Sequence, residues 1–180
     1  FDRSFLHLHP EHAVITSLDP DHLDVYGSEK AFREAFLLFT HQVNQGCLIH
    51  ADVDWVGKEN KRYGIASNRE DTAHLAYAAV APHIDQRVWT ADVKLGSEWV
   101  EGVTFPMPGL HNVSNALAAL ALAHRAGAPM DICLQRLKTF KGINRRFTYH
   151  IREEFGVYID DYAHHPSELN AAIEAARAQH

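Results

Sequence analysis

Three neighbouring residues, Asp21, His22 and Asp24, form a group that could hold a metal ion. They follow a short apolar segment and an acidic loop, and ligands gather at such strand ends in α/β folds. A neutral imidazole flanked by carboxylates can ligate a divalent cation, and the carboxylates raise its basicity. Because the chain has 14 histidines, a surface or core role is the ordinary alternative for any one of them. The loop position makes His22 a candidate metal ligand, although spacing alone does not decide the matter.

A second polar group, His111, Asn112 and Asn115, opens an alanine-rich segment. Amide side chains carry donors and acceptors that can recognise a nucleobase edge, and a helix N-terminus supplies free N–H groups. The simpler alternative is that one of these residues only caps the helix. Two asparagines spaced three residues apart lie on one helical face, which is more than one cap requires. The pattern therefore favours a nucleotide-facing role.

Two adjacent arginines, Arg145 and Arg146, follow Gly142. The planar guanidinium donates two parallel, charge-assisted hydrogen bonds and therefore suits phosphate oxygens. Solvated arginines that merely hold a connection in place are an equally good interpretation of this pair.

The last polar group, residues 160–165, lies between an apolar run and Pro166. Carboxylates at a strand end, here Asp160 and Asp161, can accept hydrogen bonds from ribose hydroxyls. His164 and His165 could meet a polar or anionic substrate, but adjacent side chains diverge and make a poor metal site. The structural alternative is that Asp161 only forms a turn. The density of polar groups favours function.

The elements that must position these groups follow from apolar patterning. Residues 13–17 predict a buried strand of a parallel sheet, and residues 46–50 predict another. Between them, Ser28 can cap a helix whose apolar residues share one face. Those residues are Ala31, Phe32, Ala35, Phe36 and Phe39.

The remaining two thirds of the chain continue the alternation of strands and helices. Residues 63–106 predict further strands, with a hairpin over 94–103. Two helices are expected, over 112–126 and from Met130 to about residue 140, with Gly127 between them and Pro129 in the first turn of the second. A strand over 157–161 and a helix over 166–177 look like the first βα unit of another domain. We expect the boundary near 148–152, with domains at 1–149 and 150–180.

The amino-acid composition excludes several classes of function. With 46% hydrophobic residues and a net charge of −6, the chain is typical of a globular protein and unsuited to sequence-independent nucleic-acid binding. No apolar run reaches the roughly 20 residues of a membrane span. Cys47 and Cys133 have no metal-ligand spacing, and free thiols in a reducing cytoplasm are expected. Because the chain starts at Phe1 within a patterned segment, we expect an interior fragment.

Taken in order, the polar stretches resemble the Mur ligases, and the resemblance covers nearly the whole chain. The matching motifs are SFLHLHP (4–10), DHLDVY (21–26), GLHNVSNALAA (109–119), RRF (145–147) and DDYAHHPSE (160–168). Each motif alone is only modestly specific, but five motifs in the same order along the chain are strong evidence for the resemblance. The SFLHL opening, RRF and the double histidine are most similar to the family member that adds L-alanine to UDP-N-acetylmuramate.

The resemblance implies an α/β fold: part of a P-loop-type central ATPase domain with a mainly parallel sheet, followed by the start of a Rossmann-like domain. It implies a cytoplasmic, ATP- and Mg²⁺-dependent amide ligase of peptidoglycan synthesis, acting through an acyl phosphate. By motif position, His22 would ligate Mg²⁺ and Arg146 would contact phosphate. The remaining implied roles are adenine recognition by Asn112 and Asn115 with His111 nearby, ribose binding by Asp161, and substrate contact by His164 and His165.

Several departures from the family pattern qualify the resemblance. The glycine-rich phosphate loop of the family does not occur in these 180 residues, so the fragment alone is expected to be inactive. Near the position where several relatives carry a carbamylated lysine stand Lys30 and Arg33, and neither is assigned a role. The alternatives are a related ligase of peptide recycling, a ligase of the folate-polyglutamate type, and a non-catalytic nucleotide-binding module.

Overall fold

The computed structural model describes residues 3–20, 23–55 and 60–179, and in these residues the main feature is a six-stranded sheet. The strands lie in chain order: β1 (Ala13–Ile15), β2 (Cys47–His50), β3 (Lys61–Ala66), β4 (Tyr77–Asp85), β5 (Val88–Leu95) and β6 (Glu98–Phe105). Strands β1 to β4 are parallel, and β5 and β6 extend the sheet with antiparallel pairings. The predicted α/β fold with a mainly parallel sheet is confirmed.

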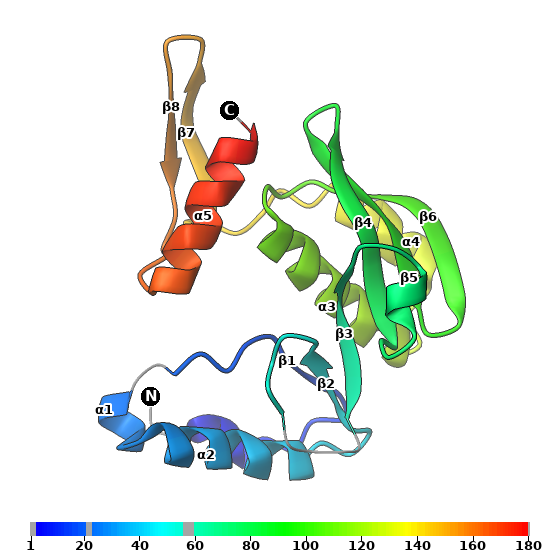
Figure 1. The fold of residues 1–180 in the computed structure, drawn as a ribbon, viewed down its shortest axis with the longest axis vertical. Helices are drawn as coiled ribbons and strands as arrows, with labels where there is room; N and C mark the ends of the chain where they lie inside the picture. The colour runs from blue at the N-terminus through cyan, green and yellow to red at the C-terminus, as the bar shows by residue number, and fades with distance from the viewer. Residues whose placement is uncertain (1–2, 21–22, 56–59, 180) are drawn as a thin grey trace.

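Helix α2 (Glu29–His41) covers one face of the sheet at the β1–β2 end (Figure 1). Ser28 begins it as predicted, because its hydroxyl accepts a hydrogen bond from Ala31 N at 3.2 Å. Phe32 is buried in one cluster with Ile15 and Ile49, and Ala35 of the same helix is also buried. The short elements η1 (Ser4–His7) and α1 (Leu23–Tyr26) flank this layer.

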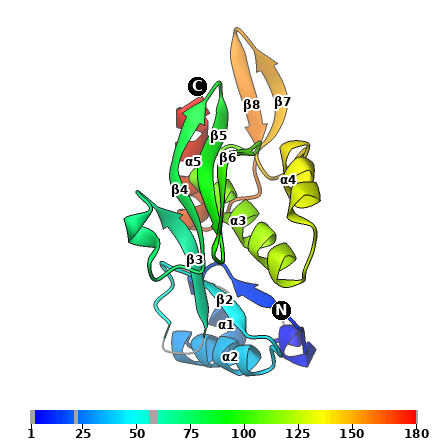
Figure 2. The same cartoon turned by 90° about the vertical axis from the view of Figure 1, so that its right-hand side faces the viewer.

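Helix α3 (Leu110–Arg125) covers the opposite face, and α4 (Met130–Lys138) packs beside it (Figures 1 and 2). Alternate strand residues divide between the two layers: Cys47 and Ile49 face the α2 side, whereas Leu48 faces α3. The small alanines of α3 let it lie close to the sheet, with Leu117 and Ala121 fully buried. Both helices were predicted, although α3 begins two residues earlier than expected.

The sheet contains two hairpins, only one of which the sequence indicated. The predicted β5–β6 hairpin turns at Gly96, whose φ is +65°. The β4–β5 hairpin turns through Gln86 and Arg87, both left-handed, with φ of 47° and 66°. Beside the sheet, η2 (Glu70–Thr72) precedes β4.

The C-terminal part forms a separate layer made of a hairpin and a helix, β7 (Thr148–Glu153), β8 (Gly156–Asp160) and α5 (Pro166–Gln179). Figure 1 shows the hairpin standing away from the main sheet. Residues 148–152, near which the domain boundary is predicted, belong to a strand that pairs antiparallel with β8, and the boundary itself stays a prediction. The predicted helix with Pro166 in its first turn is confirmed. None of the helices in the described part of the chain is long and apolar enough to cross a membrane.

Candidate functional site

A cleft of about 1180 Å³ opens where the carboxyl ends of β1 and β2 meet the start of α3 and the start of α5. One wall is polar and comes from both halves of the chain. Its polar residues include Ser17, Asp19, His50, Asp52, His111, Asn112, Asn115, Arg146, Asp161, Ser167 and Glu168. The other wall, between α3, α4 and α5, is apolar and includes Ala119, Leu137, Phe140 and Ala171. Five residues predicted from the motifs therefore open onto one cleft.

The start of α3 depends on Gly109, which is its N-cap and has φ of +93°. A Cβ at this position would lie 2.6 Å from Cε1 of His111 and 2.8 Å from Cβ of Ala175 on α5. No side chain caps α3; instead Asn112 Nδ2 donates to the Pro108 carbonyl at 2.7 Å. The capping alternative for the histidine and asparagines is therefore not what the structure shows.

His111 is the second residue of α3 and is partly buried, and this burial lowers its pKa below the ordinary histidine value. The Asp161 carboxylate opposes this shift, and the Arg146 guanidinium adds to it. The imidazole is consequently neutral at pH 7, and it can recognise a ligand by hydrogen bonding without adding charge. Asn115, one turn further along α3, is exposed on the same side of the cleft.

Asp161 shapes the loop between β8 and α5. Its Oδ2 accepts from Phe147 N at 2.8 Å, and its Oδ1 accepts from Ala163 N at 2.8 Å. The turn-forming interpretation of Asp161 is thus observed. Each carboxylate oxygen keeps a further lone pair, and the residue also lines the cleft, so a ribose contact stays a prediction.

The two arginines of the RRF motif differ in position. Arg145 stacks over the Tyr162 ring, with 4.7 Å from Cζ to the ring centroid, and lies 3.8 Å from Asp160 Oδ2. Arg146 lines the cleft, and its Nη1 is 4.0 Å from Glu168 Oε1. Of the two arginines in this motif, Arg146 is the one placed to meet an anionic ligand in the cleft.

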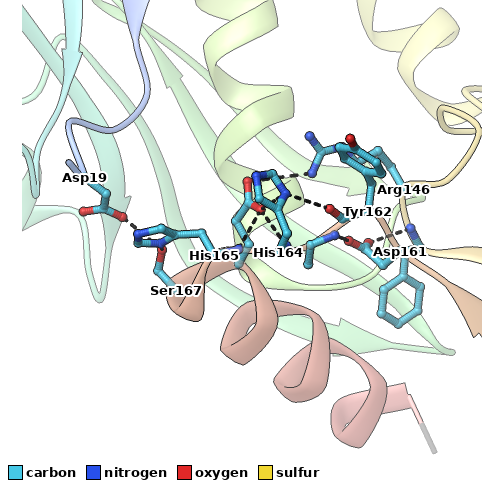
Figure 3. Close-up of polar contacts among 10 residues, drawn as sticks. Asp19, Arg146, Asp161, Tyr162, His164, His165 and Ser167 are labelled. Carbon is cyan, nitrogen blue, oxygen red and sulfur yellow. Dashed lines mark hydrogen bonds and ion pairs between the residues drawn. The ribbon is translucent and has the colours of Figure 1, made fainter. Parts of the chain in front are cut away.

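The adjacent histidines point apart, as expected from their sequence positions (Figure 3). His164 Nδ1 lies 3.1 Å from the Tyr162 carbonyl oxygen and 3.5 Å from Glu168 Oε2. His165 Nδ1 lies 2.8 Å from Ser167 Oγ, which in turn donates to Asp19 Oδ2 at 3.0 Å. Neither ring is among the residues lining the cleft, whereas Ser167 and Glu168 are.

Sequence reasoning missed two residues that line the cleft, His50 at the end of β2 and Asp52 just after it. His50 Nδ1 accepts from Asp52 N at 3.2 Å, and its ring packs edge-on against Tyr63 at 5.1 Å. Burial lowers the His50 pKa, and Asp52 partly opposes that shift. The available signal was their position at the carboxyl end of a parallel strand, where ligands of α/β proteins bind.

The predicted metal ligand His22 and its neighbour Asp21 lie outside the described residues. Within the described ranges, no group of three or more His, Cys, Asp or Glu side chains is arranged to hold a metal ion. The cleft nevertheless offers oxygen donors at the strand ends, from Ser17, Asp19 and Asp52. Oxygen is the ligand that Mg²⁺ prefers, so this donor set fits a magnesium-bound nucleotide.

The fold and the cleft define a ligand-binding α/β protein whose site lies at the carboxyl ends of parallel strands. The chain belongs to the Mur ligase family, because the model described as "Mur ligase middle domain" matches residues 3–123. Among curated relatives, the UDP-N-acetylmuramate–L-alanine ligases of Flavobacterium johnsoniae and Flavobacterium psychrophilum are 40% and 41% identical to it. Each alignment covers 98% of this chain and 38% of the relative, so the chain spans well under half of their length.

Solved structures agree with this assignment. The crystal structure of UDP-N-acetylmuramate-alanine ligase MurC from Thermotoga maritima aligns with a TM-score of 0.80 and 26% identity. That alignment covers 99% of this chain and 40% of the other. The MurF ligase of Thermotoga maritima, solved in complex with ADP, shares the fold at a TM-score of 0.65 and 16% identity, over 93% of this chain and 38% of that one.

Proposed function

We propose that the protein containing this chain is an ATP-dependent ligase that joins L-alanine to UDP-N-acetylmuramate in peptidoglycan synthesis. The observation that carries the proposal is the convergence of His111, Asn112, Asn115, Arg146 and Asp161 on one cleft. This convergence occurs in a chain 40% identical to ligases of that name. The proposed reaction proceeds through an acyl phosphate of the sugar carboxylate, and it takes place in the cytoplasm, where ATP is available.

ATP is proposed to lie along the start of α3. The amides of Asn112 and Asn115 and the neutral His111 offer hydrogen-bonding groups for an adenine edge, beside the apolar wall of α3 and α4. Asp161 would accept from the ribose hydroxyls with its remaining lone pairs. Arg146 would neutralise phosphate charge, because nothing in the described structure binds its guanidinium closer than Glu168 at 4.0 Å.

Magnesium is proposed to bind near the carboxyl ends of β1 and β2, with His22 as a ligand and the oxygen donors of Asp19 and Asp52 close by. When bound, the ion would neutralise charge on the transferring phosphoryl group. The residues of the chain would supply orientation, since phosphoryl transfer depends mainly on positioning and charge neutralisation.

The substrate side is proposed to lie at the start of α5, with His164 and His165 facing the reacting groups. Residues 1–149 would then form the end of the ATP-binding domain, and residues 150–180 the start of the domain that closes over it. Closure of this kind excludes water and completes the site.

The direct test is phosphate release by the full-length protein supplied with ATP, Mg²⁺, UDP-N-acetylmuramate and L-alanine. We expect phosphate release that depends on all four components, together with formation of the amide. A preference for a ready-made peptide over L-alanine would favour the recycling ligase. Nucleotide binding without any turnover would instead indicate a non-catalytic module.

A second prediction concerns His22. Replacement of His22 by Ala should raise the Mg²⁺ concentration needed for half-maximal activity and slow acyl-phosphate formation, because one metal ligand is lost. The measurement is a magnesium titration of initial rates, with His74→Ala, an exposed histidine outside the cleft, as the matched control. An unchanged magnesium dependence would remove His22 from the metal site.

A further inference from the structure

A chain of hydrogen bonds crosses from the connection after β1 to the start of α5. It runs from Asp19 through Ser167 to His165, with 3.0 Å between Asp19 Oδ2 and Ser167 Oγ and 2.8 Å between Ser167 Oγ and His165 Nδ1. Figure 3 shows the three side chains together at one end of the polar group. Asp19 and Ser167 both line the cleft. The chain therefore ties the two sides of the site together.

The direction of these hydrogen bonds follows from the chemistry of the groups. A serine hydroxyl has one hydrogen, and here it is donated to the Asp19 carboxylate, which accepts only. His165 Nδ1 must then carry the hydrogen that Ser167 Oγ accepts. The hydrogen bond at one ring nitrogen determines the state of the other, so Nε2 of the neutral ring presents a lone pair.

His164 is held differently. Its Nδ1 donates to the backbone carbonyl of Tyr162 in its own loop, and its side chain is 59% exposed. The support of His165, in contrast, passes through Ser167 to Asp19, which lies 148 positions before that serine. Of the two histidines, His165 is therefore the one whose orientation depends on a residue from the N-terminal part of the chain.

We propose that Asp19 and Ser167 are positioning residues that hold His165 Nε2 ready to accept a proton from the ammonium group of the amino-acid substrate. This inference rests on the proposed ligase function and on the closure proposed with it, because the His165 ring does not line the cleft in this structure. The other reacting groups, the sugar carboxylate and the phosphates, carry acceptor oxygens that a lone pair cannot hydrogen-bond. The amine is a donor, and it must lose a proton before its nitrogen can attack.

The proposed step balances as follows. The ammonium transfers one proton to His165 Nε2, and the freed amine forms a C–N bond to the carbonyl carbon of the acyl phosphate. The bond between that carbon and the phosphate oxygen breaks, and the leaving phosphate takes the second proton from nitrogen. His165 then returns its proton to solvent, so Ser167 and Asp19 keep their protonation states throughout.

The experiment uses the full-length protein and separates the two halves of the reaction. Acyl-phosphate formation is measured without amino acid by borohydride reduction to the alcohol, and amide formation is measured after adding L-alanine. We expect His165→Gln to slow amide formation about 100-fold, within the usual range for general base catalysis. Ser167→Ala should slow it about tenfold, because the ring remains but its orientation is lost. Acyl-phosphate formation should be unchanged in both variants.

Two control variants separate a loss of His165 positioning from a general structural defect. Ser167→Thr retains a hydroxyl and should recover most of the amide-forming rate, which a merely structural defect at this position would not. Ser97→Ala, an exposed serine in the β5–β6 turn, makes the same chemical change far from the cleft and should behave as wild type. If the Ser167 and His165 variants couple L-alanine at the wild-type rate, the inference about His165 is wrong while the proposed function stands. A wild-type protein that forms no acyl phosphate would remove the proposed function as well.

Discussion

Asp161 has both carboxylate oxygens bonded to backbone N–H groups, one from Phe147 and one from Ala163. Those bonds join the loop after α4 to the loop before α5. At the scale of single residues, Asp161 is thus a loop-forming residue that is also exposed to the cleft. Asn112 on α3 likewise combines two roles, because its side chain donates to the Pro108 carbonyl and also lines the cleft. Fixed side chains of this kind lose little freedom when a ligand binds.

The two cysteines should differ sharply in reactivity. Cys47 is 1% exposed in β2, and burial raises its pKa to about 11, so almost no thiolate exists at pH 8. Cys133 on α4 is only partly buried and lines the cleft. We expect iodoacetamide to label Cys133 and to leave Cys47 unmodified in the folded protein, as measured by peptide mass spectrometry.

The control for this labelling is the denatured protein, in which both cysteines should react equally. ATP should slow the labelling of Cys133 if the nucleotide occupies the apolar wall of the cleft. Rapid labelling of Cys47 in the native protein would show that β2 is less well packed than its burial indicates.

At the scale of elements, the start of α3 and α5 meet at Gly109. Gly109→Ala combines a left-handed backbone with a Cβ that would lie under 3 Å from His111 and Ala175. We expect a loss of about 3 kcal/mol or more in the free energy of unfolding, together with weaker ATP binding, because His111 must move. Denaturant unfolding and calorimetry with ATP measure the two effects.

Gly102→Ala is the matched control for that substitution. Gly102 also has a positive φ, +62°, but a Cβ there would meet nothing within 4 Å. It should therefore cost only the backbone strain, about 1–2 kcal/mol, and leave ATP affinity unchanged. Equal effects of the two substitutions would mean that the close approach at Gly109 has no consequence of its own.

The elements that the sequence predicted have strong local signals. Helix α2 has a serine cap and an apolar face, and β1 and β2 are short apolar runs buried on both faces. The missed elements lack such signals. Strand β7 is largely exposed, and its two alternating apolar residues, Tyr149 and Ile151, are too short a pattern to predict a strand. The β4–β5 turn uses Gln86 and Arg87 in left-handed conformations that usually select glycine or asparagine, and no pattern marks it.

The candidate site was predictable only in part for a related reason. His111, Asn112 and Asn115 share one helix face, and local spacing alone indicates that they belong together. That Asp19 meets Ser167 depends on how two distant loops pack, which no local pattern encodes. The motif order brought Arg146 and Asp161 into the same prediction through a family resemblance, not through geometry.

At the scale of the whole molecule, the cleft lies between two layers that are distant in sequence. The β1 and β2 ends supply one side, and α5 with its preceding loop supplies the other (Figure 1). The bonds that cross the cleft near Asp19 and Ser167 involve exposed side chains, and such contacts are individually weak. We therefore expect the two layers to separate and rejoin, as the proposed ligase function requires for substrate entry and product release.

The contact between Asp19 and Ser167 also bears on how the protein is made. It joins residues 148 positions apart, so it cannot form until α5 has left the ribosome, long after β1 has been synthesised. The sheet and α3 can be completed earlier from contacts that are nearer in sequence. This contact is consequently made after the sheet during translation, and we expect ribosome-bound chains that end before residue 167 to have a folded sheet without this side of the cleft.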